Sequence, residues 1–377
     1  MPPNNAMPTF IQYLYAIGTF EGFLLSVLLL FTPNISYASR ILGVWCVLLA
    51  VGLLSEVIIH GEEVKPIELL LAATGFFPAS FGALLYLYCR HSVLDDGFKP
   101  QDLLHLIPIA SCYLINADVF FSPSILEQAV FQEGASKPFR FILADIILFG
   151  QAFVYMGYTA IFLLRYQRRA QNNYASFNPD IFGWLWIVQG FNLIIWVFQS
   201  GAQAANSSTL FTVVGDLLIV VLIYSIGMAQ WRNPQLFKIA IPANDHRAEV
   251  ESDTDPKIAG ALDEETRASM LEAVVQYMRS QQAFLNNDLS LGGLSEAVDI
   301  STHHLSEVLN QKEGQNFYNF VNKFRIEYVC ERLKSDNDIK LLDLGLKSGF
   351  SSKSTFNSVF KKHTALTPSQ YRDKNKK

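Results

Sequence analysis

The chain has 377 residues, of which 50% are hydrophobic and 17% are charged, and its formal net charge is −5. A mean hydropathy of +0.22 is too apolar for an ordinary soluble protein, so the composition excludes a wholly soluble globular chain. The apolar excess lies before about residue 230, and the remainder has the polarity of a soluble domain. The composition therefore indicates two unlike halves.

Seven apolar stretches in the first half are long enough to cross a membrane. About 20 apolar residues in a helix span the roughly 30 Å hydrocarbon core of a bilayer. The candidate spans are residues 9–31, 41–60, 67–89, 103–121, 139–164, 181–202 and 210–230. His105, Pro108 and Asn116 interrupt the fourth stretch, so the number of spans needs independent support.

The basic residues of the connecting loops supply that support, because Lys and Arg favour the cytoplasmic side. With seven spans, most of them fall on one side: Arg40, Arg90, Lys99, Arg165, Arg168, Arg169, Arg232 and Lys238. Only Lys65, Lys137 and Arg140 fall on the other. The bias predicts a multi-pass protein of the bacterial cytoplasmic (inner) membrane, with its N-terminus outside and its C-terminal domain in the cytoplasm. We expect the first span, residues 9–31, to be a retained helix and not a cleaved signal. Residues 1–232, which contain all seven spans, are expected to form a transmembrane sensor domain.

Polar side chains inside the predicted spans are candidates for sensing, since they are costly in lipid. Four of them lie toward the outer leaflet in the predicted topology: Glu56, Asp145, Gln199 and Asp216. One interpretation is a shared pocket for an unknown small ligand or ion. The other is hydrogen bonding between helices that only holds the bundle together.

No pattern in the chain indicates catalysis or metal binding. The four cysteines form no CxxC pair, so we predict neither a disulfide nor a metal site. The HExxH, GxSxG, P-loop and dinucleotide-binding patterns are also missing. We therefore expect no enzymatic activity and no cofactor.

The second half begins with a linker and an amphipathic helix. Residues 233–261 contain prolines and acidic residues without an apolar period, which predicts an acidic, flexible linker. Residues 262–285 predict a helix with an acidic first turn and apolar residues at helical spacing. Its apolar face either packs on the C-terminal domain or pairs two protomers in a homodimer, and the pattern does not decide between these.

Residues 286–377 have the periodicity of two helix-turn-helix units. Residues 291–298 predict one short helix, Asp299 a tight turn, and Ser301 the cap of a second helix. A long helix from about residue 317 to 335 follows. A second unit starts at residue 341, turns at Gly349, and continues in a helix capped by Ser351 or Ser352. The expected fold is all-α, a seven-helix transmembrane bundle followed by a cytoplasmic, all-helical tandem helix-turn-helix domain.

Residues 287–372 resemble the AraC/XylS-type DNA-binding domain. The resemblance rests on the paired units, the Gly349-Phe350 turn, Phe356 with Phe360, and the closing sequence TPSQYR at 367–372. The sequences HHLSE at 303–307 and NFY at 316–318 resemble the branch of the family in which this domain follows membrane spans.

Three positions depart from the family pattern. Gly345 stands where the family usually has Ala, Asp299 where it often has Gly, and Ala365 where it usually has Gly. We expect the last departure to strain the turn before Thr367.

The resemblance implies sequence-specific binding of double-stranded promoter DNA, with the second helix of each unit in a major groove. The residues it implies at base edges are His303, Ser306, Glu307, Lys353, Ser354, Asn357 and Ser358. Lys361, Lys362 and Arg372 are suited to phosphates. Glu307 is either an acceptor for cytosine or a solvated charge.

Together the two halves predict a membrane-bound one-component transcription regulator controlled by a signal sensed in the membrane or envelope. Its expected partners are promoter DNA, the lipid bilayer, RNA polymerase, a small ligand or ion, and a second copy of the chain. One alternative is a transporter-like or enzyme-like bundle with an autoregulatory DNA-binding tail. Another is a bundle that serves only as an anchor.

Overall fold

The computed structural model describes residues 9–33, 35–59, 74–94, 97–121, 138–176, 179–204, 209–232, 263–335 and 339–375. Over these residues the chain forms helices, together with one isolated antiparallel bridge between Tyr174 and Ser290. This confirms the all-α prediction for the described part of the chain. The expected linker at 233–261 lies outside the described residues.

The chain divides into two compact units. The bundle unit comprises Met1–Leu163 and Gly183–Ile239, and the C-terminal unit comprises Leu164–Phe182 and Ala240–Lys377. The short segment Leu164–Phe182 therefore belongs with the C-terminal unit, although it lies between two of the expected spans. Each unit is described separately below.

Among the residues that the structure describes, five helices are long and apolar enough to cross a membrane. They are α1 (Thr9–Phe31), α2 (Tyr37–Ile59), α7 (Phe139–Asn173), α8 (Pro179–Ala204) and α9 (Thr209–Arg232). Each coincides with an expected span. Large apolar side chains on their outer faces, such as Phe20, Leu28 and Val154, are exposed, as expected for residues that face lipid.

The third and fourth expected spans have a different form. The third contains a short 3-10 turn (Phe77–Ser80) and α4 (Phe81–Val93), and residues 61–73 are outside the described part. The fourth is broken into a 3-10 helix (Pro100–Leu106), α5 (Ile107–Ile115) and a second 3-10 turn (Ala117–Phe120). Pro108 cannot continue a preceding helix because it lacks an N–H group, so a new helix starts beside it. Seven spans remain a prediction, and five helices have the required length.

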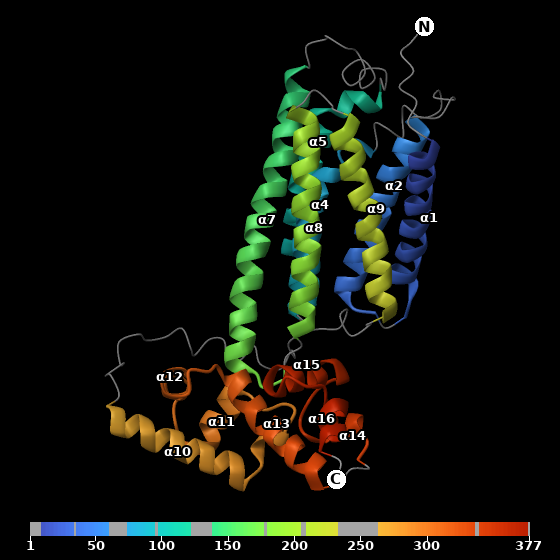
Figure 1. Cartoon of the computed structure of the whole chain (residues 1–377). Helices are drawn as coiled ribbons and strands as arrows, with labels where there is room; N and C mark the ends of the chain where they lie inside the picture. Colours follow the sequence, from blue (N-terminus) through green and yellow to red (C-terminus); the bar gives the residue numbers. More distant parts are fainter. Residues whose placement is uncertain are drawn as a thin grey trace. The chain divides into compact units, whose positions relative to one another are not determined.

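Helices α1, α2 and α9 lie side by side, as Figure 1 shows in blue and yellow. They pack closely at two glycines of α1. A Cβ atom added to Gly18 would lie 2.7 Å from a methyl group of Val220, and one added to Gly22 would lie 2.9 Å from Cβ of Ala50. Small residues at these positions let the helix backbones approach, which is the usual basis of helix association in membranes.

In its described part, the C-terminal unit contains the seven helices α10 to α16, together with the end of α7 and the start of α8. Their bounds are α10 (Glu264–Ser280), α11 (Leu291–Val298), α12 (Thr302–Lys312), α13 (Phe317–Ser335), α14 (Leu341–Lys347), α15 (Lys353–Thr364) and α16 (Pro368–Lys374). Side-chain caps start several of them, with Ser301 accepting from His304 N–H and Ser352 from Thr355 N–H. The cap of α15 is thus Ser352 and not Ser351.

The core of this unit joins α10 to the first helix-turn-helix. Leu294, Leu305 and Phe320 are buried together with Val274 and Met278 of α10, which are fully buried. The apolar face of α10 therefore packs on its own C-terminal unit, one of the two arrangements that its pattern allowed. In Figure 1, α13 connects the first helix-turn-helix, α11 and α12, to the second, α14 and α15.

Two of the departures from the family pattern occur at left-handed positions. Asp299 closes α11 with a φ of 53°, and Ala365 closes α15 with a φ of 60°. Glycine adopts this conformation without steric cost, whereas alanine does not. The expected strain before Thr367 is therefore present at Ala365.

Candidate functional site

Helix α12 presents one buried and one polar face. Leu305, Val308 and Leu309 are buried, whereas His303 is exposed and Ser306 is half-buried. The side chain of Asn310 donates to the carbonyl of Ser306 at 2.9 Å. Because residues three, four and seven apart share a helix face, the polar face of α12 carries His303, Ser306 and Asn310.

Glu307 lies at the edge of this face and is paired with α10. A guanidinium nitrogen of Arg267 lies 3.2 Å from its carboxylate, and both side chains are 18% exposed. In this conformation the carboxylate of Glu307 is engaged in an ion pair with Arg267. Arg267 lies one helical turn before the apolar residues of α10. This spacing is a signal that its side chain lies on the face of α10 that packs on the C-terminal unit.

Helix α15 has the same division into faces. Thr355, Phe356, Val359 and Phe360 are buried, and the aromatic rings of Phe356 and Phe360 lie 5.8 Å apart. The outward positions are filled by polar residues: Lys353, Asn357, Ser358 and Lys361. Lys353, Asn357 and Lys361 follow one another at intervals of four, so they form a single stripe along the helix.

The residues expected to contact DNA phosphates differ in their exposure and in their partners within the chain. Lys361 is exposed, and Lys362 is exposed with its ammonium group 3.4 Å from the side-chain oxygen of Asn319. Arg372 is half-buried in α16, where its guanidinium lies 3.7 Å from the carboxylate of Asp373. The two lysines are therefore the more accessible charges.

Ser354, at the first turn of α15, already has a partner. Its hydroxyl donates to the carboxylate of Asp180, a residue at the start of α8 within the C-terminal unit. No sequence pattern predicts that these two residues pair, because they are 174 positions apart. In this conformation Ser354 is not free to bind a base.

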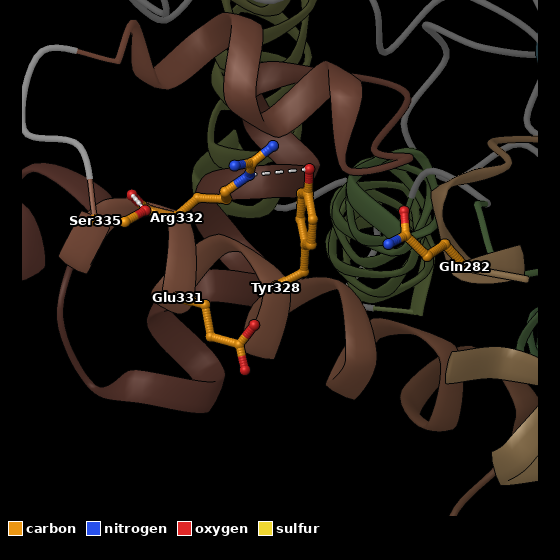
Figure 2. A pocket seen from close by; sticks show the side chains of 5 residues that line it. All are labelled: Gln282, Tyr328, Glu331, Arg332 and Ser335. Carbon is orange, nitrogen blue, oxygen red and sulfur yellow. Dashed lines mark hydrogen bonds between the residues drawn. The ribbon is translucent and has the colours of Figure 1, made fainter. Parts of the chain in front are cut away.

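A shallow depression lies elsewhere on the C-terminal unit, beside α13. It is lined by Gln282, Tyr328, Glu331, Arg332 and Ser335. Figure 2 shows Arg332 reaching toward Tyr328, whose hydroxyl it contacts at 3.2 Å. None of these residues belongs to the expected DNA-binding set.

In the bundle unit, the polar residues expected to form a pocket fall into two adjacent groups. Asp216 is buried at 6% exposure, and it accepts hydrogen bonds from Tyr15 and Gln199, each at 3.1 Å. Glu56 is close enough to interact electrostatically with Asp216. Asp145 instead accepts from Gln203 at 3.0 Å, one turn further along α8 than Gln199.

Tyr15 was missed at the sequence level, because a tyrosine inside an apolar span does not by itself indicate a buried carboxylate nearby. Among the residues that the structure describes, no cluster of three or more His, Cys, Asp or Glu side chains has a metal-binding arrangement.

Known proteins are similar to this chain over residues close to its C-terminus. Residues 294–374 match a family described as a helix-turn-helix domain. A protein of Staphylococcus aureus (strain COL) named as an uncharacterized HTH-type transcriptional regulator is 41% identical over 87 residues, which cover 23% of this chain and 12% of that protein. The match thus spans a small part of that longer relative.

Two further proteins are similar over the same region. "Probable transcription factor PqrA" of Proteus vulgaris is 30% identical over 88 residues, covering 23% of this chain and 71% of that protein. The solved C-terminal domain of AraT, a response regulator from Geobacillus stearothermophilus, is 28% identical, covers 28% of this chain and 84% of that one, and has a TM-score of 0.26.

The two helix-turn-helix units and the match to these regulators define the class of the C-terminal domain, a helix-turn-helix domain of the kind found in transcription regulators. The relatives are named as transcription regulators and not as enzymes. Within this class, the chain belongs to the AraC-type family of helix-turn-helix regulators.

Proposed function

We propose that this protein is a membrane-bound one-component transcription regulator, in which the bundle unit senses a signal and the two helix-turn-helix units bind promoter DNA. One observation supports it above all. A single chain carries five helices of membrane-crossing length and a pair of capped helices with outward polar faces. In the proposed topology the N-terminus is outside and the C-terminal unit is in the cytoplasm, in agreement with the loop charges.

In this proposal α12 and α15 each enter a major-groove segment. His303 and Ser306 read bases from α12, and Lys353, Asn357 and Ser358 read them from α15. Lys361 and Lys362 contact phosphates, since they are exposed and lie one to two turns beyond the base-reading positions. Ser354 contacts a base only when its hydrogen bond to Asp180 is broken. Glu307 stabilises α12 through its ion pair with Arg267.

DNA binding is tested with the full-length protein in lipid nanodiscs. Duplexes enriched from a random library should bind with an affinity that falls steeply as salt rises, because bound lysines and arginines release counterions from DNA. Failure to enrich any sequence, together with binding that ignores salt, would show that the C-terminal unit is not a DNA reader.

The sensing part of the proposal rests on the hydrogen-bonded group around Asp216. A buried carboxylate with Glu56 nearby offers negative charge to a cation or a proton, and either ligand would favour one packing of α1, α8 and α9 over another. Asp145 with Gln203 extends this group along α8.

Replacing Asp216 or Asp145 by Asn keeps the size of the side chain and removes its charge. We expect Asp216→Asn, and Asp145→Asn to a smaller degree, to fix target-gene output at one level without lowering the amount of protein in the membrane. Output that still responds to the signal in both variants would contradict a sensing role. Loss of the protein from the membrane would instead indicate that these groups hold the bundle together.

A further inference from the structure

Arg325 is a fully buried charge in the middle of α13. Burial lowers the pKa of its guanidinium to about 10, so it remains charged at neutral pH. No carboxylate among the described residues forms an ion pair with it. A buried charge of this kind is tolerated only when its donors are hydrogen-bonded, so its partners matter for the stability of the unit.

Besides Asn322 of its own helix and the ring of Phe350, Arg325 has hydrogen-bond partners in two different segments of the chain. Its Nε donates to the carbonyl of Phe284 at 2.7 Å, and Nη2 donates to that of Asn286 at 2.9 Å. Its Nη1 donates to the carbonyl of Ala175 at 3.0 Å and to the hydroxyl of Ser176 at 2.8 Å. The first pair precedes the first helix-turn-helix, whereas the second pair lies in the connection between α7 and α8.

That connection is built into the core of the C-terminal unit. Ala175 is fully buried, and its N–H donates to the carbonyl of Leu289 at 3.1 Å, beside the bridge between Tyr174 and Ser290. The hydroxyl of Ser176 also donates to the carbonyl of Gly349 at 3.1 Å. The connection therefore contacts the start of the first helix-turn-helix and the turn of the second.

The same connection reaches the DNA-reading end of α15 through Asp180. Its carboxylate accepts from the hydroxyl of Ser354 in the first turn of that helix. An anion at this end is favoured by the helix dipole, as a DNA phosphate would be. Asp180 and DNA therefore compete for the same end of the helix.

We propose that residues 171–176 and 179–180 form an intramolecular docking segment that binds the helix-turn-helix pair and opposes DNA binding by its second unit. Docking supplies Nη1 of Arg325 with its two short hydrogen bonds and places Asp180 against Ser354. The competition with DNA rests on the function proposed above. The docking itself rests only on contacts within the C-terminal unit.

The docking segment also provides a way for a movement of α7 or α8 to reach the helix-turn-helix pair. It continues without interruption into α7 on one side and α8 on the other, so these helices are tied to the C-terminal unit independently of residues 233–261. A shift of α7 or α8 that withdraws the segment releases Ser354. By linkage, DNA that displaces Asp180 must favour the same shift.

Docking is tested by a disulfide in the full-length protein in nanodiscs. The variant D180C/S354C carries a protease site between residues 245 and 250, and the matched control D180C/S306C places the second cysteine on α12 instead. After oxidation and cleavage we expect the two fragments of D180C/S354C to stay joined until a reductant is added, and those of the control to separate. Separation in both, or joining in both to the same extent, would overturn the docking.

Competition is tested on the same protein with the duplex enriched from the random library. We expect oxidised D180C/S354C to bind it at least about tenfold more weakly than the reduced form. We expect Asp180→Ala to bind about 3- to 30-fold more tightly than the unaltered chain. The control Asp343→Ala, which removes an exposed carboxylate of α14 outside the docking segment, should change affinity less than about twofold.

The outcomes separate the two proposals. Equal affinity of the oxidised and reduced forms, or equal gains in Asp180→Ala and Asp343→Ala, overturns the competition and leaves DNA binding intact. If the unaltered chain binds no duplex, the proposed function fails and the competition fails with it, while the cross-link still decides the docking.

Discussion

The two helix-turn-helix units share one plan but are supported by different parts of the chain. In the first, α12 is held by α10 through the pair of Arg267 with Glu307, midway along the helix. In the second, α15 is contacted at its first turn by Asp180, from a segment 174 residues earlier. The first contact lies midway along its helix, and the second lies at the end of α15 that we propose reads DNA. In our proposal the first unit is therefore permanently supported, and the second is controlled.

The largest effect is expected from replacing Arg325 of α13, the helix that connects the two helix-turn-helix units. Arg325→Leu removes the side-chain donor to the carbonyls of Phe284 and Ala175 and one of the two donors to that of Asn286, so we expect a loss of about 3–5 kcal/mol in the free energy of unfolding of the C-terminal unit. Hydrogen exchange along α13, measured by mass spectrometry on the full-length protein, reports it.

The matched control is Arg332→Leu on the same helix. Arg332 is exposed, and its guanidinium contacts the hydroxyl and ring of Tyr328 at the surface, so its loss should cost less than about 1 kcal/mol. Equal protection of α13 in both variants would show that the buried position of Arg325 is not what stabilises the unit.

The next test asks whether the two units read different DNA segments. Lys353→Ala or Asn357→Ala should lower discrimination at one segment of the site by about 1–3 kcal/mol, because side chains at the start of a recognition helix contact base edges. His303→Ala should act on the other segment. Binding to libraries randomised at single positions measures both.

Lys361→Ala combined with Lys362→Ala serves as the control for that experiment. These charges are expected at phosphates, so their removal should weaken all sequences alike and reduce the salt dependence of binding. Unchanged sequence preference in Lys353→Ala and Asn357→Ala would mean that another face of α15 reads the DNA.

A smaller effect is expected from replacing a glycine in the first helix of each helix-turn-helix unit, Gly345 in α14 and Gly292 in α11. A Cβ atom at Gly345 of α14 would lie 2.7 Å from the ring of Phe356, whereas one at Gly292 of α11 would have only the hydroxyl of Ser290, at 3.9 Å. Overpacking costs more than the gain of about 1 kcal/mol in helix propensity, so Gly345→Ala should destabilise by about 1 kcal/mol. Gly292→Ala should stabilise by about 0.5–1 kcal/mol. Thermal unfolding of both variants decides the sign.

The smallest effect concerns the support of α12. A double-mutant cycle of Arg267→Ala and Glu307→Gln should give a coupling of about 0.5–1 kcal/mol, since the pair is partly buried but still touches water. A coupling near zero would mean that this pair does not stabilise α12 against α10, and that the apolar contacts of Val274 and Met278 and the ion pair of Lys312 with Glu264 hold the two helices together.

Local rules account for what was predicted correctly. Ser301 caps α12 through an N–H three residues away, and Phe356 and Phe360 are buried because they lie one turn apart on an apolar face. The five long spans follow from apolar length alone. The fourth stretch did not follow from length, since Pro108 and Asn116 divide it into short helices.

The sequence by itself determined the all-α fold, the five long apolar helices, the caps and faces of the tandem units, and the membership of the family, because these features depend on neighbours within a few residues. Only the tertiary structure decided that Arg325 is buried against Ala175 and that Asp180 reaches Ser354. Those contacts join residues 150 and 174 positions apart. Helical periodicity shows which face of a helix is apolar. Arg325 lies one turn from both Val321 and Val329, and this spacing indicates that its charge is buried. It does not show which distant backbone carbonyls will satisfy that charge, since their places depend on how all the helices pack.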